Sequence, residues 1–133
     1  MILMPIPAGG FIMGSPETEK HRLADEKQVL VSLTETFWMA AYQCTQHQWE
    51  TVMGSNPSYF EGPHRPVENV SWSDAIDFCA KITENEHASG KLPKDLCYAL
   101  PTEAQWEYAC RAGTTTPFGI GDGNNPWFNA GKL

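Results

Sequence analysis

The four cysteines are the residues best suited to redox or metal chemistry, and their spacing limits that chemistry. They stand at positions 44, 79, 97 and 110, with separations of 35, 18 and 13 residues. Thiolates select Cu(I) among the metals, but cysteine metal motifs place two ligands only a few residues apart. We therefore expect Cys44, Cys79, Cys97 and Cys110 to be buried small apolar side chains, with Cys79 and Cys110 on buried helix faces.

Cys44 and His47 form a Cys-x-x-His pair at the expected start of a helix. Such a pair can supply two ligands to a zinc ion. A structural zinc site needs four ligands, and no second pair follows in the sequence. A zinc site here would therefore lack half of its ligands.

Two sets of residues have the types of catalytic groups but are better explained as helix-capping residues. Ser71 or Ser73 could pair a nucleophile with the carboxylate of Asp74, yet no positioned base accompanies them, and a capping role accounts for all three. Glu103 and Glu107 stand four residues apart. The first suits the positive end of a helix dipole, and the second can pair with Arg111, so neither is needed as an acid or base.

The C-terminal stretch is rich in side-chain oxygens, from Asp122, Asn124, Asn125 and Asn129. Calcium takes six to eight oxygen ligands, and these side chains offer part of such a set. The alternative is a series of turns stabilised by Asx side chains, with no ion. From the residues alone, both interpretations stay open.

Length and charge exclude several classes of protein. The chain has 133 residues and a net charge of −7, from 9 basic and 16 acidic side chains. This length suits one domain, and the charge opposes binding to nucleic-acid phosphates. No segment reaches the roughly 20 apolar residues of a membrane span. The first residues lack the basic region and apolar run of a secretory signal, so we expect either that the protein is cytoplasmic or that its true start lies elsewhere.

Local signals predict three short helices. Capping boxes start two of them, and a serine cap at Ser71 or Ser73 starts a longer one that ends before Gly90. We expect Trp72 and Trp106 to be core residues of these helices. The capping boxes are Thr45 with Gln48 and Thr102 with Gln105, and Gly54 and Gly113 end the corresponding helices.

Strands and loops are expected in the rest of the chain. Gly9 and Gly10 separate two apolar runs, which suggests a hairpin, and alternating residues predict strands at 29–34 and 37–42. Residues 15–27 are polar and are predicted to form a surface loop. The segment 56–66 is rich in Pro, Gly and Asn, so we predict an ordered irregular loop held by Tyr59 and Phe60.

Four segments together resemble one known family. The stretch LPTEAQWEYA at 100–109 is similar to the LPTEAEWEYA signature of the formylglycine-generating enzyme family, also called the sulfatase-modifying factor family. The family pattern also matches IPAGGFIMGS at 6–15, CTQHQWETVMGSNPSYF at 44–60 and RPVENVSWSDAIDFC at 65–79. One departure is Ala99, where the family usually has Arg.

The resemblance implies an α+β fold with little regular secondary structure, an irregular relative of the C-type lectin fold. It implies that residues 1–133 are the N-terminal part of a single sulfatase-modifying-factor domain that continues beyond them. The chain would then be incomplete at its C-terminus, and self-association or dependence on the C-terminal half is expected.

The resemblance also implies an activity. Family enzymes are oxidoreductases that mature sulfatases by converting a sulfatase cysteine to Cα-formylglycine with oxygen, using copper held by two cysteines in the C-terminal half. No cysteine of this chain matches that pair, so no catalytic residue is assigned and copper is expected only in a full-length catalytic relative. We expect this chain to supply scaffold and part of the groove for a sulfatase client peptide.

Two further expectations come from the family. Cys79 and Cys110 match positions that form structural disulfides in some members, with partners in the C-terminal half. Asn129 lies near the first ligand of a structural calcium ion, whose remaining ligands lie further along the family domain. The alternative function is a non-catalytic lectin-like module that binds a ligand, because one fold can carry different functions.

Overall fold

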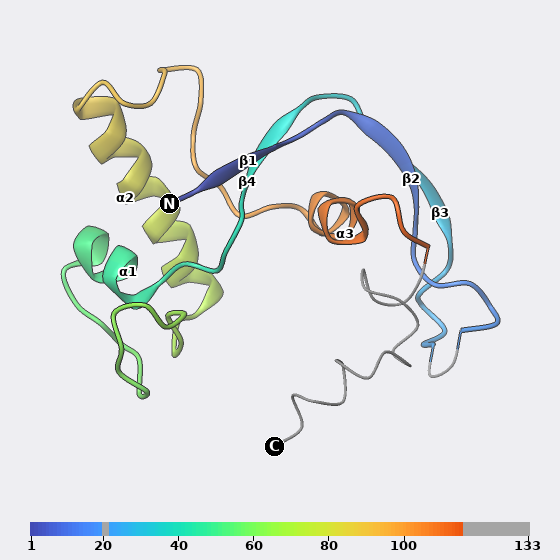
Figure 1. Cartoon of the computed structure of the whole chain (residues 1–133), viewed down its shortest axis with the longest axis horizontal. Coiled ribbons are helices and arrows are strands. Elements are labelled where there is room, and N and C mark those ends of the chain that lie inside the picture. The colour runs from blue at the N-terminus through green and yellow to red at the C-terminus, as the bar shows by residue number, and fades with distance from the viewer. Residues whose placement is uncertain (20–21, 116–133) are drawn as a thin grey trace. The chain divides into compact units, whose positions relative to one another are not determined.

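The computed structural model describes residues 1–19 and 22–115 (Figure 1). Within these residues the chain forms four short strands and three helices. In chain order they are β1 (Leu3–Ile6), β2 (Gly9–Met13), β3 (Val29–Leu33), β4 (Phe37–Ala40), α1 (Gln46–Met53), α2 (Trp72–Ala88) and α3 (Glu103–Arg111).

The chain folds as two compact units. The first contains Met1–Met4 and Trp38–Leu100, and the second contains Pro5–Phe37 and Pro101–Leu133. The boundaries between the units fall inside β1, between Phe37 and Trp38, and after Leu100. Each unit therefore combines segments that are far apart in the sequence.

The first unit contains the start of β1, most of β4 and two helices. Strands β1 and β4 pair with one another, and the amide of Ala41 extends the ladder by donating to the carbonyl of Ile2 over 3.0 Å. Helices α1 and α2 pack through Trp49 and Phe78, whose rings stack at a centroid distance of 5.1 Å and an angle of 4°. These two side chains, 5% and 6% exposed, are the only fully buried hydrophobic residues in the described part of the chain.

In the second unit, β2 and β3 form an antiparallel pair against which α3 lies. The register pairs Gly9 with Leu33 and Met13 with Val29. The ring of Tyr108 on α3 lies 5.3 Å from that of Phe11 on β2. A Cβ atom at Gly9 would come within 2.4 Å of the Tyr108 hydroxyl, so this approach requires glycine.

An ion pair on α3 fixes the end of β2. Glu107 and Arg111 are joined over 2.7 Å, and the same Glu107 oxygen accepts from the amide of Gly14 over 2.9 Å. Arg111 also donates to the carbonyl of Gly14 over 3.0 Å. Both backbone groups of Gly14, which has a φ of +93°, are therefore satisfied by one helix turn.

The three predicted helix starts are confirmed. Thr45, Ser71 and Thr102 each cap a helix in a complete capping box. Helix α1 ends at Gly54 in the left-handed region, as predicted, whereas α3 is closed by Ala112 with φ 46°, one residue before Gly113. The strands at 29–33 and 37–40 are confirmed as β3 and β4.

Two expectations about local structure are wrong. The hairpin around Gly9 and Gly10 does not form, because β1 pairs with β4 while β2 pairs with β3. The tryptophans predicted as core are solvent-exposed, Trp72 by 73% and Trp106 by 59%. Helix α3 instead packs through Tyr108 and the Glu107–Arg111 pair, which lie on a different side of the helix.

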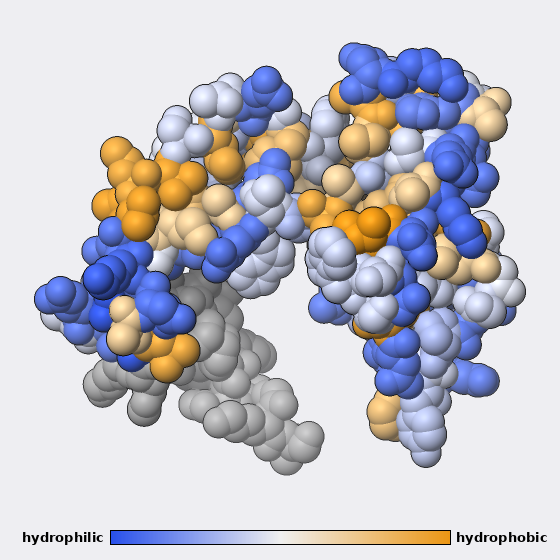
Figure 2. All heavy atoms as spheres, turned by 180° about the vertical axis from the view of Figure 1, so that it is seen from behind, coloured by the Kyte–Doolittle hydropathy of each residue, from blue (hydrophilic) through white to orange (hydrophobic). Residues whose placement is uncertain are grey.

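The described chain is thus a small mixed α/β protein with short sheets. None of the helices in residues 1–19 and 22–115 has both the length and the apolar composition needed to cross a membrane. Figure 2 shows apolar side chains on the visible surface among polar ones. Fifteen large hydrophobic side chains are exposed in the described residues.

Candidate functional site

The segment between α1 and α2 forms an irregular loop that is held mainly by one buried side chain. Gln46, the first residue of α1, is only 1% exposed. Its amide nitrogen donates to the carbonyls of Phe60 and Pro66 over 2.9 and 3.2 Å, and its oxygen accepts from the Asn56 side chain and the Gly62 amide, both over 2.9 Å. All four hydrogen-bonding positions of this glutamine are therefore used to hold the loop.

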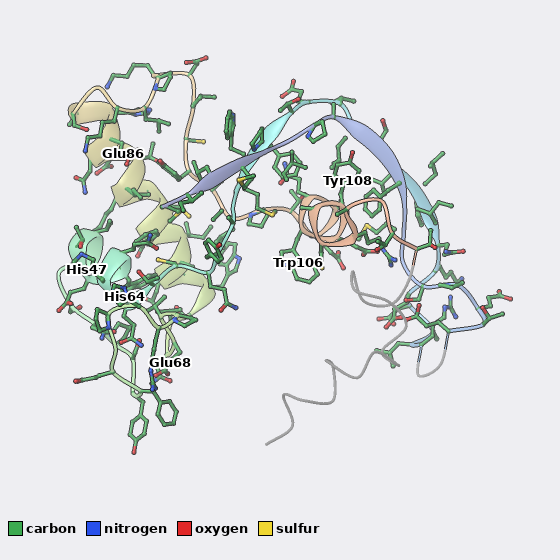
Figure 3. The ribbon with its side chains drawn as sticks, in the orientation of Figure 1. His47, His64, Glu68, Glu86, Trp106 and Tyr108 are labelled. Carbon is green, nitrogen blue, oxygen red and sulfur yellow. The ribbon has the colours of Figure 1, made fainter. Side chains whose placement is uncertain are left out.

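We call residues 56–68 the 56–68 loop. Glu68 binds the side of this loop that contains Tyr59 and Phe60. Its carboxylate accepts hydrogen bonds from the amides of Tyr59 and Phe60, the latter over 2.8 Å (Figure 3). Its own amide donates to the hydroxyl of the buried Ser58 over 3.1 Å. A carboxylate bound by two backbone amides is a strong, charge-assisted anchor.

This arrangement leaves two aromatic side chains exposed. Tyr59 and Phe60 are 77% and 62% exposed, and their rings meet edge to face at 5.0 Å. The prediction that they hold the loop is therefore wrong. Gln46 and Glu68 bind the backbone of the loop, so that the two rings are free to contact another molecule.

A groove of about 370 Å³ lies next to this loop in the first unit. Tyr42, His64 and Pro66 contribute to its lining, together with the N-terminal residues Met1 and Ile2. His64 and Pro66 belong to the 56–68 loop. The groove and the exposed aromatic pair thus share one structural element.

Sequence reasoning missed Gln46 and Glu68. One signal was available for Gln46: it precedes the buried Trp49 by three residues, which places both on one helix face. A polar residue on a buried face must find hydrogen-bond partners. No comparable signal exists for Glu68, because its partners are backbone amides of an irregular loop.

The residues considered for metal and acid/base chemistry have structural contacts instead. The Cys44 thiol donates to the carbonyl of Thr45 over 3.6 Å, and His47 is exposed. No group of three or more His, Cys, Asp or Glu in the described residues is arranged to hold a metal ion. Ser71 and Asp74 bond to one another within their capping box, as predicted.

The four thiols are less buried than predicted. Cys97 and Cys110 are exposed, and Cys44 and Cys79 are half-buried. Partial burial raises the pKa of the Cys44 thiol, and the nearby charge of Cys79 raises it further. Burial likewise raises the pKa of Cys79, with a second contribution from Cys97. The two half-buried thiols are thus held in their protonated, less reactive form.

The ligands that calcium and copper require can be compared with the residues of this chain. Asn129, the predicted calcium ligand, and the neighbouring Asp122, Asn124 and Asn125 lie outside the described residues. The four cysteines are separated by 35, 18 and 13 residues and so lack the close spacing of a cysteine metal motif. No step of a mechanism is therefore assigned to copper in this chain.

Comparison with known proteins gives the context for this geometry. The model of the sulfatase-modifying factor enzyme 1-like domain matches residues 2–132. The chaperone protein LppX of Paenibacillus barcinonensis is 34% identical, covering 90% of this chain and 52% of that protein. The formylglycine-generating enzyme of Mus musculus is 29% identical, covering 84% of this chain and 40% of that enzyme.

A solved structure is similar as well. PvdO from Pseudomonas aeruginosa matches with a TM-score of 0.71 and 26% identity, over 87% of this chain and 49% of that one. The chain thus spans about half the length, or less, of these relatives. The family match covers nearly every residue of the chain. On this evidence the chain belongs to the sulfatase-modifying factor family, which includes the formylglycine-generating enzymes.

Proposed function

We propose that this chain forms the framework and part of the client-binding groove of a formylglycine-generating protein. The whole protein would convert a sulfatase cysteine to Cα-formylglycine. Membership of the family and the similarity to the mouse formylglycine-generating enzyme support this proposal. We further propose that residues 1–133 are the N-terminal part of one family domain, with the irregular C-type-lectin-like fold and with Asn129 as a calcium ligand.

The observation that carries the proposal is the construction of the 56–68 loop. Its backbone is fixed by Gln46 and Glu68, while the rings of Tyr59 and Phe60 remain exposed. A loop that is already ordered loses little conformational entropy when it binds a peptide. Aromatic rings offer large contact areas to proline and to the guanidinium of arginine. Both residues occur in the Cys-x-Pro-x-Arg sequence of a sulfatase client.

The oxidation itself is assigned to other parts of a family protein. Oxidising a thiol with oxygen requires a metal or cofactor that carries one-electron steps. In the family this is a copper ion on a cysteine pair that no cysteine of this chain matches. The chain's own residues therefore bind and orient the client peptide in this proposal.

A second candidate function is supported by one comparison. The similarity to the chaperone protein LppX favours a function in binding a protein client. The same exposed rings would then contact apolar segments of many sequences. The two candidates differ in sequence selectivity, since a chaperone-type surface does not require the Cys-x-Pro-x-Arg motif.

Peptide titration tests the proposal. A fluorescently labelled Cys-x-Pro-x-Arg peptide should bind the chain, and Tyr59→Ala with Phe60→Ala should weaken binding at least about tenfold, the effect of losing central aromatic contacts. The matched control is Trp72→Ala, which removes a ring of similar exposure, 73%, outside the loop.

A scrambled peptide of the same composition separates the two candidates. Binding that requires the motif order supports the sulfatase-directed function. Equal binding of the motif, the scrambled peptide and an unfolded protein supports the chaperone-type function. If the loop variants bind as tightly as the parent chain, the 56–68 loop is not the client surface.

A further inference from the structure

The segment 91–100 is attached to α2 by a short chain of hydrogen bonds. The amide of Tyr98 donates to the hydroxyl of Thr83 over 2.9 Å, and this hydroxyl donates to the carbonyl of Cys79 over 2.7 Å. The Tyr98 hydroxyl also donates to Glu86 over 2.7 Å. The peptide bond between Cys97 and Tyr98 is therefore only two hydrogen bonds away from the backbone of Cys79.

Both cysteines line one groove within the first unit. This groove has a volume of about 420 Å³ and is bordered by Ile76 and Ala80 of α2 on one side and by Tyr98 on the other. Cys97 is exposed to solvent, and Cys79 is half-buried in the groove. One thiol is thus open to a reagent from solution, while the second lines the same groove in a more protected position.

The effect of the Cys97 charge on the pKa of Cys79 supports the proximity of these two thiols. The pKa of Cys79 is raised first by burial and then by the negative charge of the Cys97 thiolate, which acts only over short distances. Burial and the hydrogen bond with Glu86 raise the pKa of Tyr98 to about 12, so its hydroxyl keeps donating at neutral pH. The attachment of this segment to α2 therefore persists under the conditions in which the thiols react.

We propose that Cys79 and Cys97 are a dithiol pair that closes reversibly to an intramolecular disulfide, which ties the segment 91–100 to α2. Cys97 is the attacking residue because it is exposed, and Cys79 is the resolving residue because it is protected. This segment ends at the boundary between the two units, after Leu100. The disulfide would restrict the chain where it enters the second unit.

The oxidant is a small-molecule disulfide, and the reaction balances with it. The Cys97 thiolate attacks one sulfur of the oxidant, whose S–S bond breaks and releases one thiolate. The Cys79 thiolate then attacks Cys97 in the mixed disulfide and releases the second thiolate. Two protein thiols are oxidised, one disulfide is reduced to two thiols, and the two protons pass to the released thiolates.

Cys44 is the competing partner for Cys79, because each of these thiols lies near the other. Its thiol is half-buried, donates to the Thr45 carbonyl and lies outside this groove, so a reagent reaches Cys97 more easily. The family resemblance implies a different partner for Cys79, in the C-terminal half. Cys97 offers a partner inside the described chain.

Peptide mapping tests the proposal on the full 133-residue chain. The folded chain is treated with oxidised glutathione, quenched in acid, alkylated and digested with trypsin and an enzyme that cuts after glutamate. Cuts after Glu68, Lys81, Lys94 and Glu103 place Cys79 and Cys97 in separate peptides, 69–81 and 95–103. We expect these two peptides linked by a disulfide and a fall from four to two free thiols per chain.

Three controls make the result specific. Cys110→Ser should leave the 79–97 crosslink unchanged. Cys79→Ser should leave Cys97 as a lasting mixed disulfide with glutathione, which shows that the resolving thiol is missing. In urea the preference for the 79–97 pair should disappear, because an unfolded chain favours the shorter loop between Cys97 and Cys110.

The alternative outcomes overturn the proposal. A crosslink between Cys44 and Cys79, a crosslink between two chains on a non-reducing gel, or stable glutathione on Cys97 of the unmutated chain would each show that Cys79 does not resolve Cys97. Four free thiols after treatment with glutathione disulfide alone would show that the pair does not form.

Discussion

Gln46 shows how one polar side chain determines the conformation of a whole loop. Its carboxamide makes four hydrogen bonds to the 56–68 loop while it is almost completely removed from water. A buried polar group that loses its partners costs more free energy than a neutral hydrogen bond contributes. The loop therefore depends on this residue more than on its own exposed aromatic rings.

The substitution Gln46→Ala should destabilise the first unit by about 2–4 kcal/mol, because it leaves two carbonyls, one amide and the Asn56 side chain without their partner. Urea unfolding followed by far-UV circular dichroism measures this change. The control is Gln43→Ala, an exposed glutamine three residues earlier, which should change stability by less than about 0.5 kcal/mol. Equal midpoints for both variants would contradict the role of Gln46.

The start of helix α3 can be predicted from neighbouring residues, whereas the side on which the helix packs cannot. A capping box consists of neighbouring residues, so Thr102 and Gln105 could be recognised without knowledge of the fold. The side of the helix that faces the unit depends on distant segments. Trp106, predicted to be buried, is 59% exposed, while Glu107 and Arg111 bind Gly14, which directly follows β2 and is more than ninety residues away in sequence.

The same contrast holds for the other elements. The caps at Thr45 and Ser71, the strands β3 and β4 and the irregular character of the 56–68 loop could all be predicted from short windows of sequence. Strand pairing could not be predicted from short windows, because it joins segments on opposite sides of a polar loop. The exposed rings on the 56–68 loop could not be predicted from the sequence either, since the conformation of this loop depends on hydrogen bonds to backbone groups of irregular segments.

Glu107→Ala should destabilise the second unit by about 1.5–3 kcal/mol, because it removes charge-assisted hydrogen bonds to both Gly14 and Arg111. Glu103→Ala is the matched control: it removes an exposed glutamate from the first turn of the same helix, where the dipole contributes about 0.3–1 kcal/mol. Chemical denaturation of both variants gives the comparison. A Glu107→Ala variant as stable as Glu103→Ala would show that the bonds to Gly14 contribute little.

The described part of the chain buries few hydrophobic residues for its length. In the described residues only Trp49 and Phe78 are fully buried hydrophobics, and Trp38, Trp72 and Trp106 are all more than half exposed. Monomeric proteins rarely leave large apolar surfaces open to water. Strands β2 and β3 form a sheet of two strands, which is marginal without further covering.

We therefore predict that the isolated chain self-associates or requires a partner segment. Sedimentation over a range of concentrations should show a rising average mass, and an apolar dye should fluoresce on binding. The 133-residue chain can be compared with a longer family protein that contains this sequence, which should bind less dye. A monomer at all concentrations, with one sharp unfolding transition and no dye binding, would contradict this prediction.

The most direct test of the proposed function asks whether the chain oxidises a client by itself. A Cys-x-Pro-x-Arg peptide is incubated with the chain, with and without Cu(I), and its mass is measured. We predict that the cysteine stays unmodified, because oxidation of a thiol by oxygen requires a metal or cofactor and no cysteine of this chain matches the family's copper-binding pair. Conversion to formylglycine by this chain alone, abolished when two of its own cysteines are replaced, would contradict the assignment of oxidation to other parts of a family protein.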